Sequence, residues 1–176
     1  MNIKDAANYY KSFLAQKEKE KRYAELSNQL FRHEGYRRFA YKCTANKLTI
    51  GIGRNIDQKG GTGISKDEAE YLLRNDIEEK TEKLAQRFPR LNKLDNVRQD
   101  VLINMVFNLG PNNQKTLKKT LEEVEKVLDN KSEWKKVSEV MLSGAWAKQV
   151  KGRAKELANQ MKTGEYKNNK YLSKNT

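Results

Sequence analysis

The stretch that decides the fold is HEGYRRFAYKCTANKLTIGIGR, residues 33–54. Before it, apolar side chains recur at helical spacing from the start of the chain to about residue 33. Within it, Leu48, Ile50 and Ile52 alternate with Thr49 and two glycines, and this period of two indicates a short strand. We expect the three aliphatic side chains to face a core and Thr49 to lie on the opposite, accessible face.

After this strand the pattern becomes helical again. Ser65 and Glu68 form a capping box that begins a helix, and Phe88-Pro89 ends it. At 1.5 Å per residue this helix is about 34 Å long, enough to join a small sheet-bearing lobe to a helical one.

The rest of the chain predicts a helical lobe. Asp95 begins a helix that is apolar almost all round, which favours a buried position. Three more helices are expected at about 115–129, 132–143 and 150–163, with Trp134 and Trp146 in the core. The fold class is therefore α+β, mainly α: a small lobe with a short antiparallel sheet, joined by a long helix to a larger helical lobe.

Composition narrows the classes of function. The chain has 176 residues and a formal charge of +13, with one cysteine and one histidine. A single cysteine excludes a disulfide framework and a cysteine-based zinc site, and a lone histidine argues against a histidine-ligated metal or a Ser-His-Asp site. The charge permits polyanionic partners such as nucleic acid, anionic lipid or an acidic cell wall. Half of the 36 basic residues precede residue 89, and this even spread argues against a dedicated nucleic-acid-reading helix.

Glu34 is the first candidate for chemistry. It stands beside Gly35, at the expected C-terminal end of its helix, where the negative end of the helix dipole disfavours an ionised carboxylate. A carboxylic acid that stays protonated near neutral pH is what general-acid cleavage of a glycosidic bond needs. Taken alone, these local features favour an ordinary surface glutamate at a helix end.

The spacing of the residues after Glu34 makes its catalytic interpretation more specific. Cys43 follows after eight intervening residues, and Thr49 after five more. This resembles the phage-type lysozymes of glycoside hydrolase family 24, whose catalytic pattern is Glu, then Asp or Cys, then Thr at these spacings. Three further blocks resemble the family in the same order, and the resemblance covers roughly residues 28–170. They are ISKDEAEYLLRND, LDNVRQDVLINMVFNLG, and a C-terminal motif with Trp146, Gln149 and Arg153-Ala154-Lys155.

The resemblance implies catalytic roles for Glu34, Cys43 and Thr49 and a supporting role for Arg153. Glu34 would protonate the leaving sugar, Thr49 would orient the attacking water or contact the sugar, and Arg153 would pair with Glu34. Cys43 stands where most familiar members carry Asp. Its thiolate is open to roles as nucleophile or base, and the alternative is a half-buried hairpin cysteine with no part in the chemistry. Retaining and inverting mechanisms both stay open.

The resemblance also implies substrate-binding and supporting residues. The substrate-binding set is Phe107, Asn108 and Gly53, although helix geometry alone favours Phe107 as a core residue. Arg54 replaces the histidine that is commonest after Gly-x-Gly. Asp76 matches the acidic partner of that histidine, so we expect an Arg54–Asp76 ion pair.

These features together predict a peptidoglycan muramidase. It would hydrolyse the β-1,4 bond between N-acetylmuramic acid and N-acetylglucosamine without a cofactor or metal, and so cause bacterial cell-wall lysis. The alternatives are a cell-wall-binding homologue that Cys43 has left weak or inactive, or a basic nucleic-acid-binding helical protein. A lysozyme-like catalytic domain is expected at 28–176, after a helical extension at 1–27. Within it we expect the small lobe at about 36–64, the long helix at 65–88 and the helical lobe at 89–176.

The sequence also suggests where such an enzyme would act. No apolar stretch fits a signal peptide or a membrane span. We expect a monomer that is cytoplasmic on synthesis and reaches the wall when a partner such as a holin opens the inner membrane. Its excess positive charge would attract it to the anionic cell envelope.

Overall fold

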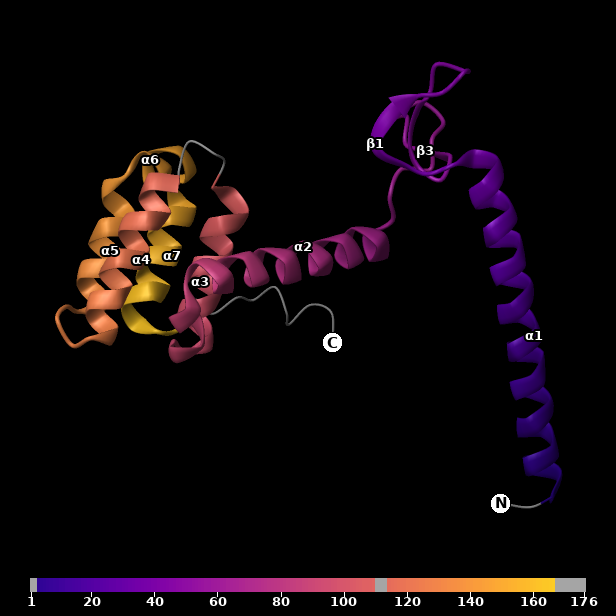
Figure 1. Ribbon diagram of the computed structural model, residues 1–176, viewed down its shortest axis with the longest axis horizontal. Helices are drawn as coiled ribbons and strands as arrows, with labels where there is room; N and C mark the ends of the chain where they lie inside the picture. Colours follow the sequence, from indigo (N-terminus) through magenta and orange to yellow (C-terminus); the bar gives the residue numbers. More distant parts are fainter. Residues whose placement is uncertain (1–2, 110–113, 167–176) are drawn as a thin grey trace. The chain divides into compact units, whose positions relative to one another are not determined.

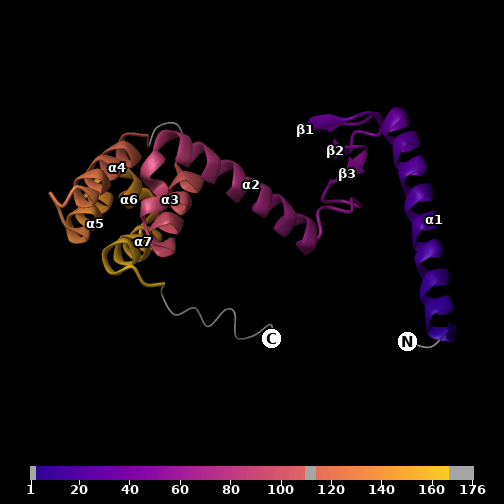
Figure 2. The same ribbon diagram turned by 60° about the horizontal axis from the view of Figure 1, so that its bottom comes forward.

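The computed structural model describes residues 3–109 and 114–166 and is mainly helical with one small sheet (Figures 1 and 2). The chain divides into two compact units, residues 1–69 and residues 70–176. The N-terminal unit contains α1 (Ile3–Glu34) and the sheet, and α2 (Lys66–Arg87) contributes residues to both units. This is the lysozyme-like α+β fold that the sequence predicts.

The helix α1 is one continuous element of 32 residues. It ends at Glu34, and Gly35 directly after it adopts a left-handed conformation with φ +68°. The Gly35 N–H donates to the carbonyl of Phe31 at 3.0 Å, and this closes the last turn. The predicted end of the helix is confirmed, and Glu34 is its final residue.

The sheet consists of β1 (Arg37–Lys42), β2 (Leu48–Gly51) and β3 (Arg54–Asn55), antiparallel and in that order. The turn between β1 and β2 holds Asn46 at φ +57°, and its N–H donates to the carbonyl of Cys43 at 2.8 Å. Because β2 is the middle strand, Thr49 has a partner on each side, Tyr41 in β1 and Asn55 in β3.

The expected orientation of this strand is wrong. Thr49 is 4% exposed, whereas Leu48 is 38% and Ile52 is 45% exposed. Thr49 is flanked by strands on both sides, and its hydroxyl turns back to donate to the carbonyl of Lys47 at 3.1 Å. Ile52 has already left β2 and lies in the turn before β3. Alternation identified the strand but could not say which of its faces would be covered.

The start and end of α2 agree with the predicted signals. The Glu68 N–H donates to the Ser65 hydroxyl at 3.2 Å, and the Ser65 N–H donates to the Glu68 carboxylate at 2.8 Å. The capping box is therefore formed in both directions. The helix ends at Arg87, and Pro89 begins a short 3₁₀ helix, η1 (Pro89–Lys93).

Five α-helices build the core of the C-terminal unit together with the end of α2 and η1 (Figure 1). α5 packs against both α4 and α7, and α7 also contacts α3 and α6. Trp146 is fully buried at the centre, as predicted, and Trp134 packs at the edge of the core. The helices are α3 (Asn96–Asn108), α4 (Gln114–Leu128), α5 (Trp134–Ser143), α6 (Ala145–Val150) and α7 (Gly152–Thr163).

The expected helix at 150–163 differs from the observed one at its start. Lys151 has φ +43°, outside the right-handed helical region, and it separates the six-residue helix α6 from α7. A helix of six residues is too short to show a clear periodic pattern, so α6 could not be predicted from periodicity.

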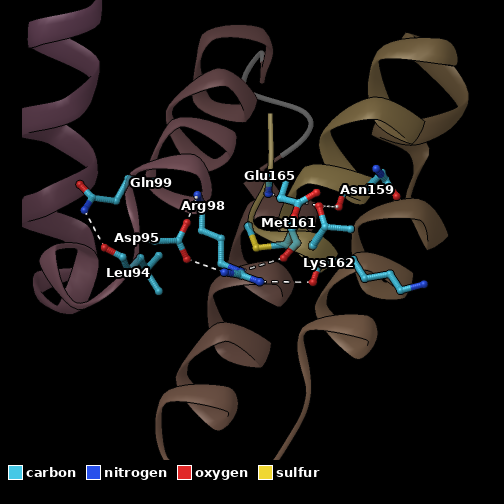
Figure 3. A network of polar contacts seen from close by, with 9 residues as sticks. Leu94, Asp95, Arg98, Gln99, Asn159, Met161, Lys162 and Glu165 are labelled. Carbon is cyan, nitrogen blue, oxygen red and sulfur yellow. Dashed lines mark hydrogen bonds and ion pairs between the residues drawn. The ribbon is translucent and has the colours of Figure 1, made fainter. Parts of the chain in front are cut away.

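Arg98 joins the beginning of α3 to the end of α7 (Figure 3). Its guanidinium donates to the carbonyls of Met161 at 2.9 Å and Lys162 at 3.2 Å, and it also binds the Asp95 carboxylate. The same group lies 4.2 Å from the centre of the Trp134 ring. Asp95 in turn caps α3 by accepting from the Arg98 N–H at 3.0 Å. One side chain therefore satisfies carbonyls at a helix end that have no partner within the helix.

Candidate active site

The carboxylate of Glu34 lies against the turn between β2 and β3. A Cβ built on Gly53 would stand 2.5 Å from Oε2 and 2.9 Å from Cδ of Glu34. Gly53 has φ +68°, so the backbone conformation of this turn also favours glycine. The structure therefore brings two of the predicted site residues together and shows that Gly53 is a neighbour of the candidate acid.

Cys43 and Thr49 form the second part of the candidate site. Cys43 is half-buried directly after β1, and its N–H donates to the carbonyl of Lys47 at 3.0 Å across the hairpin. Hydrogen bonding with the backbone of Lys47 lowers the pKa of the Cys43 thiol, the Thr49 hydroxyl adds to this, and partial desolvation opposes it. The hairpin therefore favours the thiolate, which is the reactive form of cysteine. Thr49 faces this thiol from its buried position instead of the accessible face expected for it.

Arg54 has a different partner from the predicted one. Its guanidinium donates to both carboxylate oxygens of Glu68, at 2.6 and 2.9 Å, and to the carbonyl of Gly63 at 2.6 Å. The structure thus gives Arg54 a bidentate partner in Glu68, and the expected Arg54–Asp76 ion pair stays a prediction, because Asp76 belongs to the other unit. The ion pair closes the loop between β3 and α2.

Glu68 thus has two functions that the sequence showed only in part. Its carboxylate caps α2 through the Ser65 N–H and also binds Arg54. The Ser65 N–H is the larger cause, and Arg54 the smaller, of a pKa for Glu68 below its ordinary value. The capping box was visible in the sequence, but its second partner was not.

The C-terminal unit contributes a polar cluster around Arg153. From α7, Arg153 donates to the side-chain oxygen of Asn104 through Nε at 3.0 Å and a terminal nitrogen at 2.7 Å, and to that of Asn108 at 2.7 Å. Asn108 donates its own amide to the carbonyl of Asn104 at 2.9 Å. Asn104 is half-buried. Its spacing from Asn108, one helical turn along α3, was the signal that could have identified the pair.

Phe107 lines an open pocket of about 570 Å³ in the same unit. Apolar side chains of α2, α3 and α7 form much of its lining, and Arg153 and Asn104 stand among its polar residues. Phe107 is half-buried and is not part of the core cluster. Its assignment to substrate binding, like that of Asn108, stays a prediction, and so does the pairing of Arg153 with Glu34.

The sheet, the helical core and the spacing of Glu34, Cys43 and Thr49 define a lysozyme-like protein. The chain belongs to the phage lysozyme family, which matches residues 31–167. It is 27% identical over 168 positions to a protein named "Probable T4-type lysozyme 1" from Dictyostelium discoideum, a match that covers 80% of this chain and 95% of that protein. It is 34% identical over 79 positions to an endolysin of Acyrthosiphon pisum secondary endosymbiont phage 1, covering 45% of this chain and 53% of the endolysin.

Two further observations concern the parts of the chain around the matched range. Most of α1 precedes residue 31 and so has no counterpart in the family match. Within residues 3–109 and 114–166, no helix has the length and apolar character required to cross a membrane.

Proposed function

We propose that this protein is a peptidoglycan muramidase that hydrolyses the β-1,4 bond between N-acetylmuramic acid and N-acetylglucosamine. The observation that carries the proposal is the N-terminal unit, in which one small sheet holds the Glu34 carboxylate at one turn and the Cys43–Thr49 pair at the other. Membership of the phage lysozyme family and the names of the two relatives support the same reaction class.

Glu34 is assigned the role of general acid. Its carboxylic proton passes to the glycosidic oxygen as the bond from that oxygen to the anomeric carbon breaks, so the leaving sugar departs as a neutral alcohol. The close approach of the Glu34 carboxylate to Gly53 in the β2–β3 turn supports this role, because Cys43 and Thr49 belong to the neighbouring hairpin.

Cys43 is assigned the anionic role that a carboxylate fills in most familiar members. Its lowered thiol pKa supports the presence of the thiolate. As a base, the thiolate removes a proton from water while the resulting hydroxide bonds to the anomeric carbon, which inverts the configuration. As a nucleophile, sulfur bonds to the anomeric carbon, and a water deprotonated by Glu34 then displaces it, which retains the configuration. Thr49 orients the sulfur through its hydroxyl.

A substitution series at Cys43 tests this assignment. Cys43→Asp restores an anion and should keep the hydrolysis rate within about tenfold of wild type, whereas Cys43→Ser should reduce it by roughly 100-fold or more because serine does not ionise. Full activity of Cys43→Ser would remove Cys43 from the chemistry. The anomeric configuration of the first product, followed by NMR, separates the base role from the nucleophile role.

The reaction itself is tested on purified peptidoglycan. We expect new reducing ends, and borohydride reduction followed by mass spectrometry should show that they are N-acetylmuramic acid. Reducing ends on N-acetylglucosamine would contradict the proposed bond. Retention on the wall without any new reducing end would favour the alternative of a wall-binding homologue that has lost turnover.

The polar cluster of the C-terminal unit is assigned to substrate binding. Arg153 is exposed, and the side-chain amides of Asn104 and Asn108 orient its guanidinium. We assign Phe107 and Asn108 to contacts with the sugar, and Arg153 to the support of Glu34. The protein is proposed to act as a monomer on the cell wall, attracted by the anionic envelope, after a partner such as a holin provides the route to it.

A further inference from the structure

We infer that Gly53 is a positioning residue for Glu34, a role that rests on the proposed function of Glu34 as the acid. The absence of a side chain at Gly53 is what permits the Glu34 carboxylate to lie against the β2–β3 turn. A Cβ at this position would approach three consecutive groups of the acid, Oε2 at 2.5 Å, Cδ at 2.9 Å and Cγ at 3.1 Å. Real Cβ atoms do not approach other heavy atoms at the two shorter distances.

A side chain at Gly53 would displace the side chain of Glu34. The atoms in its path belong to the end of a flexible side chain and not to the backbone. Glu34 can therefore rotate away from the turn, and the fold can tolerate the substitution. The reactive carboxylate would then be held in a different place, and a displacement of about 1 Å at a reacting group can lower a rate by roughly 100-fold.

The chain offers a matched control two residues earlier. Gly51 has nearly the same backbone conformation, φ +65° against φ +68° at Gly53, so alanine introduces similar strain at either position. A Cβ built on Gly51 meets no atom within 4 Å. The difference between the two substitutions therefore isolates the contact with Glu34 from the strain of the left-handed conformation.

The experiment compares Gly53→Ala with Gly51→Ala on purified peptidoglycan. We expect the two variants to unfold at similar temperatures, whereas kcat of Gly53→Ala should be lower than that of Gly51→Ala by roughly 100-fold with little difference in KM. The alkaline limb of the pH–rate profile should also move in Gly53→Ala alone, because this limb reports the loss of the proton from the acid, whose surroundings change. A merely structural role would lower the unfolding temperature and leave this limb where it is.

Equal kcat values for the two variants would overturn the inference. Should strain prevent either alanine variant from folding, Gly53→Asn and Gly51→Asn provide a second pair, since asparagine tolerates the left-handed conformation better than alanine. Glu34→Gln is measured beside them. Wild-type activity in Glu34→Gln would contradict the proposed function itself. Loss of activity in Glu34→Gln, together with equal rates for the two glycine variants, would contradict only the role of Gly53.

Discussion

Replacement of Arg98 by methionine gives the sharpest test of the packing that supports the helical unit. Methionine retains the unbranched apolar stem but removes every contact of the guanidinium. Two hydrogen bonds from a charged donor to the carbonyls of Met161 and Lys162 are lost, each worth about 1.5 kcal/mol. The contact with the Trp134 ring, at 4.2 Å, adds roughly 0.5–1 kcal/mol.

The sum predicts a loss of about 3.5–4 kcal/mol in the free energy of unfolding. For a chain of this length each kcal/mol lowers Tm by about 2–4 °C, so Arg98→Met should lower Tm by roughly 7–16 °C. Urea denaturation followed by circular dichroism measures the free energy, and calorimetry measures Tm. The side chain of Arg98 is only 12% exposed, so solvent does not replace these contacts.

Arg90 supplies the control. It also binds two acidic side chains, Glu125 and Asp129, but from a position that is 38% exposed. Ion pairs of this kind contribute little, so Arg90→Met should change Tm far less than Arg98→Met. An equal change in Tm for the two variants would show that the Arg98 contacts at the end of α7 contribute no more to stability than an exposed ion pair, contrary to this prediction.

Four other outcomes are expected from the site and its surroundings. The rate of alkylation of Cys43 by iodoacetamide should reach half its maximum below pH 9.0, because hydrogen bonding with the Lys47 backbone lowers the pKa of the thiol; a midpoint at or above 9.0 would contradict this. The pKa of Glu68 is depressed in the folded state, so the stability that its carboxylate contributes is present above about pH 4.5 and is lost as the pH falls further. Glu68→Gln should therefore flatten the acid side of a Tm–pH curve, and an unchanged slope would contradict this contribution of Glu68. The hydrogen bond to the Asp100 carboxylate raises the pKa of Tyr166 to about 12, so the stability that this hydrogen bond contributes is present below pH 10 and is lost between pH 10 and 12. The tyrosinate absorbance difference between wild type and Tyr166→Phe should develop only toward pH 12, and its development near pH 10 would contradict this. Added salt should slow lysis of whole walls more steeply than hydrolysis of short soluble fragments, because salt screens the +13 charge from the anionic envelope. An equal salt dependence of the two rates would show that the charge contributes only to solubility.

The signals that succeeded in the sequence are local ones. Gly35 ends α1, Ser65 and Glu68 cap α2, Asp95 caps α3, and Pro89 stops the long helix. Each of these depends on the geometry of one chain segment of a few residues, so the sequence contains all the information required. The mainly helical fold followed from such signals and from the change of periodicity at residues 33–54.

The predictions that failed concern relations between segments. Alternation in β2 located the strand, but the burial of Thr49 depends on its two neighbouring strands and on a hydroxyl that turns back to Lys47. The Arg54–Glu68 ion pair was not predicted, because the sequence does not show that the capping role of Glu68 already holds its side chain near the loop. The motif supplied Gly53 as a substrate-binding residue, whereas its contact with Glu34 appears only in three dimensions.

The central claim is that Glu34 is the acid of a glycosidic hydrolysis, and Glu34→Gln tests it most directly. Glutamine preserves the size of the side chain but cannot donate the proton. Glu25→Gln is the matched control, an exposed glutamate on the same helix before the range shared with the family. The measurement is the release of reducing ends from purified peptidoglycan. We predict a loss of at least about 100-fold for Glu34→Gln and none for Glu25→Gln; release by Glu34→Gln at the wild-type rate would contradict the account.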